Sequence, residues 1–314
     1  GEAAEVLTEM VSDPDCQVVG TFSGAMTVAK MGLILCDMID WGWLDMIITT
    51  GALMAHGFVE AVGMTHFKHD DRFNDAALYR RGYNRIYDTL ELEKNLDRAE
   101  EVISGILDSM DTSEPLSSEV FCRELGRWLT EETEKPGVLR NAYLKGVPVY
   151  IPAFTDSELA LDVGTWMTKK AMANDRALDI ATAINQVNIS FNPFLDLSSY
   201  TTRVLKAKRL GIFTIGGGVP RNWAQQVSPY LEILDERCQG SLPFKKFHYG
   251  VRICPEPAYW GGLSGCTYSE GVSWGKFVAP EDGGRFAEVL CDATVAWPFL
   301  VKAVKQRLDK RKKA

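Results

Sequence analysis

The chain has 314 residues, a formal net charge of -8 and a hydrophobic fraction of 46%. This length suffices for one large α/β domain or two ordinary ones, and the acidic balance argues against a nucleic-acid-binding protein. No uncharged run approaches the roughly 18 residues that span a bilayer, so we expect no membrane segment. Seven cysteines without a CxxC pair predict a reducing, cytoplasmic location with neither disulfides nor a zinc site.

Two apolar runs near the N-terminus predict buried strands that each lead into a turn and a helix. The run at 17–20 precedes a small-residue turn at 21–27, and the run at 45–50 precedes Gly51 and a helical stretch at 54–62. Both turns bring hydroxyls and backbone N–H groups to a helix N-terminus, which is a geometry that receives phosphates. Neither is a GxGxxG motif, so the spacing alone is a weak indication of a nucleotide site.

The segment 64–135 interrupts this pattern. Residues 64–94 are rich in charged and aromatic side chains, and 92–110 and 117–133 have the pattern of amphipathic helices. We therefore predict a single domain over 1–314 with a mainly helical, polar insertion around 64–135. His66 and His69 have a spacing that metal ligands use, but no convincing third ligand is nearby in the sequence, so we predict no metal site.

Strand patterns resume after the insertion, at 146–152, 176–181, 211–215, 248–254 and 288–292, with a closing helix at 297–308. The basic residues at 305–313 are expected to form a solvated helix end. Strands that alternate with helices predict an α/β fold, a doubly wound, Rossmann-like parallel sheet with helices on both faces. Ligands of such sheets lie outside the carboxyl ends of the strands, so the turns that follow the strands are expected to form one site.

The block at 261–276 contains five glycines, which allow close backbone approach to a ligand. Lys276 follows Trp274 by two residues and Glu270 by six. A lysine is a nucleophile only when its amine is neutral, and an apolar wall such as an indole lowers the lysine pKa. Trp274 can also face a cation. A lone lysine is more often a surface residue, but these surroundings favour an active-site role.

The segment Glu-Gly-Val-Ser-Trp-Gly-Lys at 270–276 resembles the active-site segment of the deoxyhypusine synthase family, whose lysine forms a covalent imine. The resemblance runs over roughly residues 21–300. It includes the triple-glycine turn at 216–218, a Pro-Ala-x-Thr-Asp segment that ends at Asp156, and an aspartate–alanine pair at 292–293. The family binds NAD and moves the 4-aminobutyl group of a polyamine such as spermidine to an acceptor amine.

The resemblance implies roles for the matched residues, with Lys276 as the imine-forming nucleophile. Residues expected at NAD are Ser23, Thr27, Thr49, Thr50, Gly51, Asp156, Gly216, Gly217, Gly218, Asp292 and Ala293. Residues expected at the polyamine are Trp274, Glu270, Asn222, Gln226 and Ser264. A carboxylate such as Asp292 accepts from ribose hydroxyls and repels a 2′-phosphate, which favours NAD over NADP. The resemblance alone also implies a homotetramer, with 64–94 as the candidate contact.

Several positions depart from the eukaryotic family pattern. Leu263 and Trp260 replace acids, and Ala55 stands where a glutamate occurs, so an anchor of ~1.5–3 kcal/mol is absent or relocated. This favours a small acceptor amine such as putrescine, giving homospermidine, over the protein lysine of translation factor 5A. Asn222 replaces a histidine and cannot take a proton near neutral pH. His56 is therefore the predicted general base, with a structural, hydrogen-bonded histidine as the alternative.

Two other functions fit the same residues. One is an NAD-dependent amine oxidoreductase without group transfer, in which Lys276 would be structural. The other is a non-catalytic NAD-binding protein, which the intact Trp-Gly-Lys sequence at 274–276 argues against.

Overall fold

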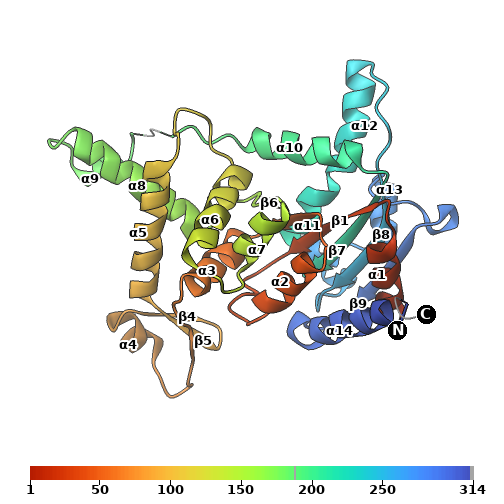
Figure 1. Ribbon diagram of the computed structural model, residues 1–314, viewed down its shortest axis with the longest axis horizontal. Helices are drawn as coiled ribbons and strands as arrows, with labels where there is room; N and C mark the ends of the chain where they lie inside the picture. The colour runs from red at the N-terminus through yellow and green to blue at the C-terminus, as the bar shows by residue number, and fades with distance from the viewer. Residues whose placement is uncertain (187–188, 312–314) are drawn as a thin grey trace.

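The computed structural model describes residues 1–186 and 189–311, and its centre is a six-stranded parallel sheet (Figure 1). The spatial order is β6-β2-β1-β7-β8-β9. The strands are β1 (Cys16–Phe22), β2 (Met46–Thr49), β6 (Val149–Tyr150), β7 (Arg209–Ile215), β8 (Phe247–Ile253) and β9 (Arg285–Val289). Counted within this sheet, the order is that of the doubly wound dinucleotide-binding fold. The predicted fold class is confirmed.

Alternate side chains of the strands point into two separate hydrophobic cores. On one face, Phe22 and Phe213 pack with α1 (Glu2–Ser12), α2 (Gly32–Asp40) and α14 (Ala293–Arg311). On the other face, Val19 and Ile212 pack with α10 (Pro193–Lys206), α11 (Gly218–Gln225), α12 (Val227–Cys238) and α13 (Tyr268–Ser273). In Figure 1, α10 and α14 lie on opposite sides of the sheet. Both faces are therefore covered, as predicted.

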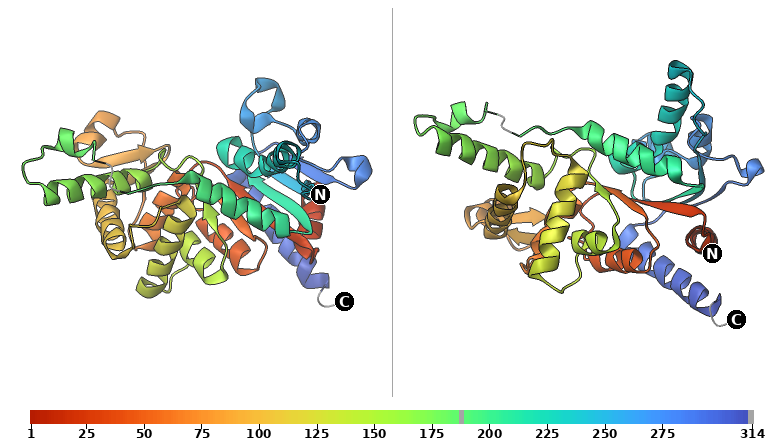
Figure 2. Two further views of the ribbon diagram at one scale, coloured as in Figure 1. Left: turned by 90° about the horizontal axis from the view of Figure 1, so that it is seen from above. Right: turned by 45° about the horizontal axis from the view of Figure 1, so that its top comes forward.

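The chain between β2 and β6, which we call the insertion from here on, contains the segment 64–135 predicted as an insertion and lies toward the end of the molecule away from the chain termini (Figure 2). Its helices are α3 (Gly51–Ala61), α4 (Asp75–Arg80), α5 (Glu93–Ser109), α6 (Ser118–Glu132) and α7 (Val138–Lys145). The hydroxyl of Ser117 accepts from the Val120 N–H at 3.3 Å and caps α6. The two predicted amphipathic helices are confirmed as α5 and α6.

A small antiparallel sheet inside the insertion was absent from the sequence-based prediction. It consists of β3 (Phe67–Lys68), β4 (Tyr83–Ile86) and β5 (Thr89–Leu92), in the order β3-β5-β4. Its strands are only two to four residues long and carry charged side chains. Such short segments show no clear alternation of apolar and polar residues, so only tertiary contacts reveal them.

The strand predicted at 176–181 is wrong. This region holds a turn and the short helix α9 (Ile180–Ala183), which follows α8 (Glu158–Asn174). Asp179 caps α9 by accepting from the Thr182 N–H at 2.8 Å. Ile180 is exposed, so the apolar residues here do not enter a sheet. The closing helix α14 is longer than predicted, and residues 312–313 of the basic end lie outside the described residues. None of the helices in the described ranges has the length and apolar character needed to cross a membrane.

Candidate active site

Side-chain contacts link neighbouring turns at the carboxyl edge of the sheet. The hydroxyl of Thr50, after β2, donates to the Gly24 carbonyl after β1 at 2.7 Å. The hydroxyl of Ser23 donates to the carbonyl of Gly217, after β7. The gap between β1 and β7 is the point where the strand order reverses, and doubly wound proteins bind their ligands there. The turns after β1, β2 and β7 are therefore in contact at this edge.

Glycines let the turns approach one another closely. A Cβ on Gly51 would lie 2.1 Å from the Cβ of Ser157, in the turn after β6, and a Cβ on Gly217 would lie 2.6 Å from the Cα of Ser264. Gly216 has a φ of 78°, a conformation that L side chains rarely adopt. The turns that follow β6, β2, β1 and β7 and the loop that contains Ser264 therefore form one continuous row of contacts. At Gly51 and Gly217 the absence of a side chain therefore allows the turns to pack against Ser157 and Ser264.

Other residues predicted to contact NAD are engaged in local structure. Thr27 and Thr49 are buried, and the Thr27 hydroxyl donates to the Leu53 carbonyl at 2.8 Å. Oδ1 of Asp292 accepts from both N and Oγ1 of Thr294, at 2.8 and 2.6 Å, at the start of α14. Capping with one oxygen leaves the other oxygen for a ribose hydroxyl. The roles of these residues at NAD remain predictions.

Lys276 is buried and reaches the helix that begins at the triple-glycine turn. Its residue exposure is 8%, and its Nζ donates to Oδ1 of Asn222 on α11 at 3.2 Å. Its backbone is held by hydrogen bonds to the Gly271 carbonyl and from the Phe247 N–H, both 3.0 Å. The structure therefore fixes both ends of the predicted nucleophile.

The electrostatic surroundings of Lys276 favour a neutral amine. Burial lowers the lysine pKa below its ordinary value, and the nearby Arg221 cation lowers it further. Cys266 and Glu270 act in the opposite direction without reversing the shift. Because only the unprotonated amine attacks carbon, this environment raises the fraction of reactive lysine at a given pH.

The other residues predicted to bind substrate differ in exposure. Trp274 is 63% exposed, so its indole does not form the wall that buries the lysine within this chain. Glu270 on α13 and Gln226 at the end of α11 are exposed, whereas Asn222 and Ser264 are half-buried. The structure brings Asn222 to the lysine and Ser264 to the glycine turn, and the predicted substrate contacts remain to be tested.

Two buried arginines that the sequence reasoning missed hold the loop beside the glycine turn. Arg221 donates to the Cys266 carbonyl at 2.6 Å, and Arg252 donates to the same oxygen at 3.1 Å. Arg252 also donates to the Glu288 carboxylate at 2.8 Å. An arginine within the buried strand 248–254 was the available signal, because a buried cation requires polar partners.

His56 lies in the second turn of α3, away from the lysine. Its Nδ1 is 2.9 Å from Oε2 of Glu91 and its Nε2 is 3.8 Å from a carboxylate oxygen of Glu158. Among the interactions of the described residues, none joins His56 to Lys276 or Asn222. The predicted role as general base is untested by this geometry.

A family model for deoxyhypusine synthase matches residues 1–304. The chain belongs to the deoxyhypusine synthase family. The "Probable deoxyhypusine synthase 2" of Archaeoglobus fulgidus is 30% identical over 300 residues, which are 96% of this chain and 90% of that protein. The "Probable deoxyhypusine synthase 1" of Methanosarcina acetivorans is 32% identical over 313 residues, 99% of this chain and 86% of that protein.

The family assignment agrees with the fold. A solved structure of a "putative deoxyhypusine synthase" from Entamoeba histolytica has a TM-score of 0.60 and 15% identity, and the match covers 96% of this chain and 86% of that one. Deoxyhypusine synthases are NAD-dependent enzymes that transfer an aminobutyl group. Membership therefore makes this chain an enzyme of that general class.

Proposed function

We propose that the protein binds NAD and a polyamine such as spermidine, and transfers the 4-aminobutyl group through an imine on Lys276. One observation carries the proposal. The Lys276 amine is buried, has a lowered pKa and lies 3.2 Å from Oδ1 of Asn222, in a chain of this family. Bound NAD would supply a hydride acceptor for the donor amine and return the hydride to the product.

Lys276 performs the transfer between these two redox events. The neutral amine attacks the carbon of the oxidised donor, and the bond from that carbon to the departing diaminopropane breaks. The acceptor amine then attacks the same carbon and releases the lysine. The hydride removed at the start is returned at the end, so the transfer needs no external oxidant. The Asn222 carbonyl accepts from the lysine N–H and orients its lone pair toward the substrate.

The proposed NAD site uses the backbone of the turns around Gly51 and 216–218 for the pyrophosphate. The turns carrying Ser23 and Thr50 meet these glycines and shape the site. Asp292, at the end of the sheet edge formed by β9, is the proposed partner of a ribose hydroxyl and the reason to expect NAD rather than NADP.

We favour a small amine such as putrescine as acceptor. Trp260 and Leu263, which stand at family acidic positions, are 68% and 52% exposed, and Ala55 is buried. These side chains offer no charge to a second ammonium group. Incubation with NAD and spermidine, with and without putrescine, tests the proposal when products are identified by mass spectrometry. Homospermidine is expected, and modification of translation factor 5A alone would contradict the small-amine preference.

Borohydride trapping separates transfer from simple amine oxidation. Under turnover with spermidine, reduction is expected to leave a 4-aminobutyl adduct on Lys276, detected by peptide mass spectrometry. Formation of an aldehyde product without any adduct would instead support an amine oxidoreductase.

Two residues are the proposed alternatives for the general base: His56, on its place in the helix that starts at the edge of the NAD site, and Glu270, if the ring of His56 is engaged elsewhere. The role of His56 predicts that His56→Gln lowers the rate by ~10²-fold with little change in NAD affinity. It also predicts that the acidic limb of the pH–rate profile disappears. If His56→Gln retains both the wild-type rate and the acidic limb of the pH–rate profile, another residue is the general base, and Glu270 is the next to test.

A homotetramer is the proposed assembly, with 64–94 at a contact. Phe73, Tyr79 and Tyr87 in this segment are strongly exposed, which is consistent with a covering partner. Light scattering at micromolar concentration tests this, and a fully active monomer would refute it. A cytoplasmic location remains a prediction, and the seven cysteines are unpaired in the structure.

A further inference from the structure

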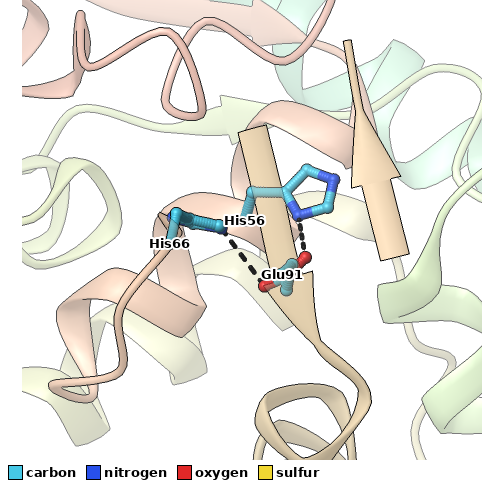
Figure 3. Close-up of side chains that lie close together, drawn as sticks. All are labelled: His56, His66 and Glu91. Carbon is cyan, nitrogen blue, oxygen red and sulfur yellow. Dashed lines mark ion pairs between the residues drawn. The ribbon is translucent and has the colours of Figure 1, made fainter. Parts of the chain in front are cut away.

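Three side chains from separate parts of the insertion meet in a buried cluster (Figure 3). His56 comes from α3, His66 from the loop before β3, and Glu91 from β5. The two histidine rings face different oxygens of one carboxylate. Nδ1 of His56 is 2.9 Å from Oε2 of Glu91, and Nε2 of His66 is 3.2 Å from Oε1. The ligand-type atoms all lie within 4.8 Å of one another.

The facing atoms of this cluster lack hydrogen-bond partners. Nδ1 of His56, Nε2 of His66 and both oxygens of Glu91 are buried and have no partner with hydrogen-bond geometry. The exposures of the three residues are 7%, 7% and 1%. Buried nitrogen and oxygen atoms that point together without hydrogen bonds are costly unless something else satisfies them.

The remaining ring nitrogens face further carboxylates. Nδ1 of His66 is 3.0 Å from Oε1 of Glu60, and Nε2 of His56 is 3.8 Å from Glu158. Metal-binding histidines commonly direct one nitrogen at the ion and the other at a carboxylate, which fixes the ring and raises its basicity. His66 is arranged in that way, and Nε2 of His56 faces Glu158 beyond hydrogen-bond distance.

The charges around the cluster also leave room for a cation. Three carboxylates surround the rings, those of Glu60, Glu91 and Glu158. The cation that faces them is Lys30, whose Nζ pairs with Glu60 and lies 3.3 Å from Nδ1 of His66. A metal binds only neutral rings and displaces their protons. With both rings neutral, the group carries a net charge of about -2, which a divalent ion neutralises.

We propose that His56, His66 and Glu91 bind a divalent transition-metal ion of the zinc type. Two imidazoles and one carboxylate are a ligand set that zinc uses, with a solvent molecule in the remaining position. The ion would join α3, the loop before β3 and β5, and so attach the small antiparallel sheet to the helix that starts at the Thr50–Gly51 turn. It would thereby stabilise the Thr50–Gly51 turn at the edge of the proposed NAD site.

This assignment is independent of the proposed aminobutyl transfer. It does exclude the role of His56 as general base, because a metal-bound imidazole has no free lone pair for a proton. The two assignments of His56 therefore make different predictions, and metal content distinguishes them.

The test uses untagged full-length protein that has been stripped with a chelator and dialysed against Zn²⁺ or Co²⁺. The wild type is expected to retain one ion per chain. The visible spectrum of the Co²⁺ form should be that of a four- or five-coordinate ion with nitrogen and oxygen ligands. Glu91→Gln and His66→Gln should lose this uptake. Glu60→Gln removes only the carboxylate behind His66, so its affinity is expected to fall by roughly 10–100-fold.

His69→Gln is the matched control, because it removes another histidine of the same insertion whose Nδ1 lies 3.6 Å from Asp71 instead. Its metal uptake should equal that of the wild type. Wild-type uptake well below one ion per chain, or full uptake by Glu91→Gln, overturns the proposal. If Glu91→Gln and His66→Gln do not fold, the Co²⁺ spectrum of the wild type and the affinity of Glu60→Gln decide the question: an unchanged affinity overturns the site.

Discussion

Two buried groups of ionisable side chains, at Lys276 and at His56–His66–Glu91, differ in the charge of their neighbours. The lysine faces an amide oxygen and lies near the Arg221 cation, and burial lowers its pKa. In the histidine cluster, the carboxylate of Glu60 and then that of Glu91 raise the pKa of His66 to about 9. The two buried bases are therefore shifted in opposite directions, since burial is the main cause that lowers the pKa of Lys276 and neighbouring carboxylates raise the pKa of His66.

The comparison assigns different purposes to the two groups. The lysine centre lies beside the turns of the parallel sheet, where a ligand is expected, and burial lowers the pKa of its amine. The histidine cluster lies inside the insertion and holds positive charge, as protons or as a metal ion.

The largest effect is expected from Lys276→Arg. A guanidinium remains protonated and cannot form the imine, so transfer should fall by on the order of 10³-fold or more, with NAD affinity retained. Product assays and NAD titration measure the two quantities. Lys208→Arg is the matched control at an exposed lysine that pairs with Asp15 at 2.8 Å, and it should leave both unchanged. Near-normal transfer by Lys276→Arg would falsify the imine mechanism.

Glu91→Gln, measured in the presence of a chelator, is expected to reduce the free energy of unfolding by about 3–5 kcal/mol. The substitution leaves two buried rings without their shared carboxylate, and breaking a buried ion pair from one side has this cost. Urea denaturation measures the change. Asp70→Asn, which removes the exposed partner of Arg72, should have little effect, and an equally small effect of Glu91→Gln would show that the cluster is not a structural centre.

Asn222→Asp is expected to move the pH dependence of the lysine. Wild-type imine formation should rise as pH increases through the lowered pKa of Lys276, because deprotonation produces the nucleophile. A carboxylate at 222 would raise that pKa by about one unit, so the limb moves to higher pH and the rate at neutral pH falls roughly tenfold. The rate of borohydride-trapped adduct formation against pH measures this. Asn222→Gln keeps an uncharged amide, so adduct formation should rise over the same pH range as in the wild type. If Asn222→Asp also leaves this pH range unchanged, the ionisation that controls the rate is not that of Lys276.

The smallest effect is expected from Asp292→Asn, at the far end of the sheet edge. Replacing a charged acceptor by a neutral one costs ~1 kcal/mol of ribose binding, about fivefold in the ratio of NAD to NADP affinity. Asparagine also caps helices, so stability should change little and the cofactor effect is isolated. Titration with both cofactors measures the ratio, and comparable wild-type affinities for NAD and NADP would rule out the assignment.

The parallel sheet could be predicted because its evidence is local. The strands at 46–49 and 209–215 are mainly apolar. Of the three glycines that follow residue 215, Gly216 and Gly217 make close contacts with Ser23 and Ser264 that require small residues. The failed strand at 176–181 shows the limit of this evidence. This run contains a single β-branched residue, Ile180, and a short run becomes a strand only if a neighbouring strand is present to pair with it, which is not encoded locally.

The histidine cluster could not be predicted for the same reason. His66 and His69 have metal-ligand spacing in sequence, but the structure directs them to different partners. The partners of His66 are 25 residues onward at Glu91 and ten residues back at His56, and β5 and α3 bring them together. Likewise, the contact of Lys276 with Asn222 spans 54 residues. Only the family resemblance gave an indication of that contact.

The strand order has a consequence for synthesis of the chain. The central strands β1 and β7 pair through residues 193 positions apart, including the buried hydroxyl pair Thr21–Thr214. At about 5–20 residues per second, a ribosome takes roughly 10–40 s to make the chain between them. Until then β1 is a free strand edge beside β2, with an apolar face and unpaired backbone groups. A central strand of the finished enzyme is therefore an open edge, able to pair with other chains, for much of the synthesis of the protein.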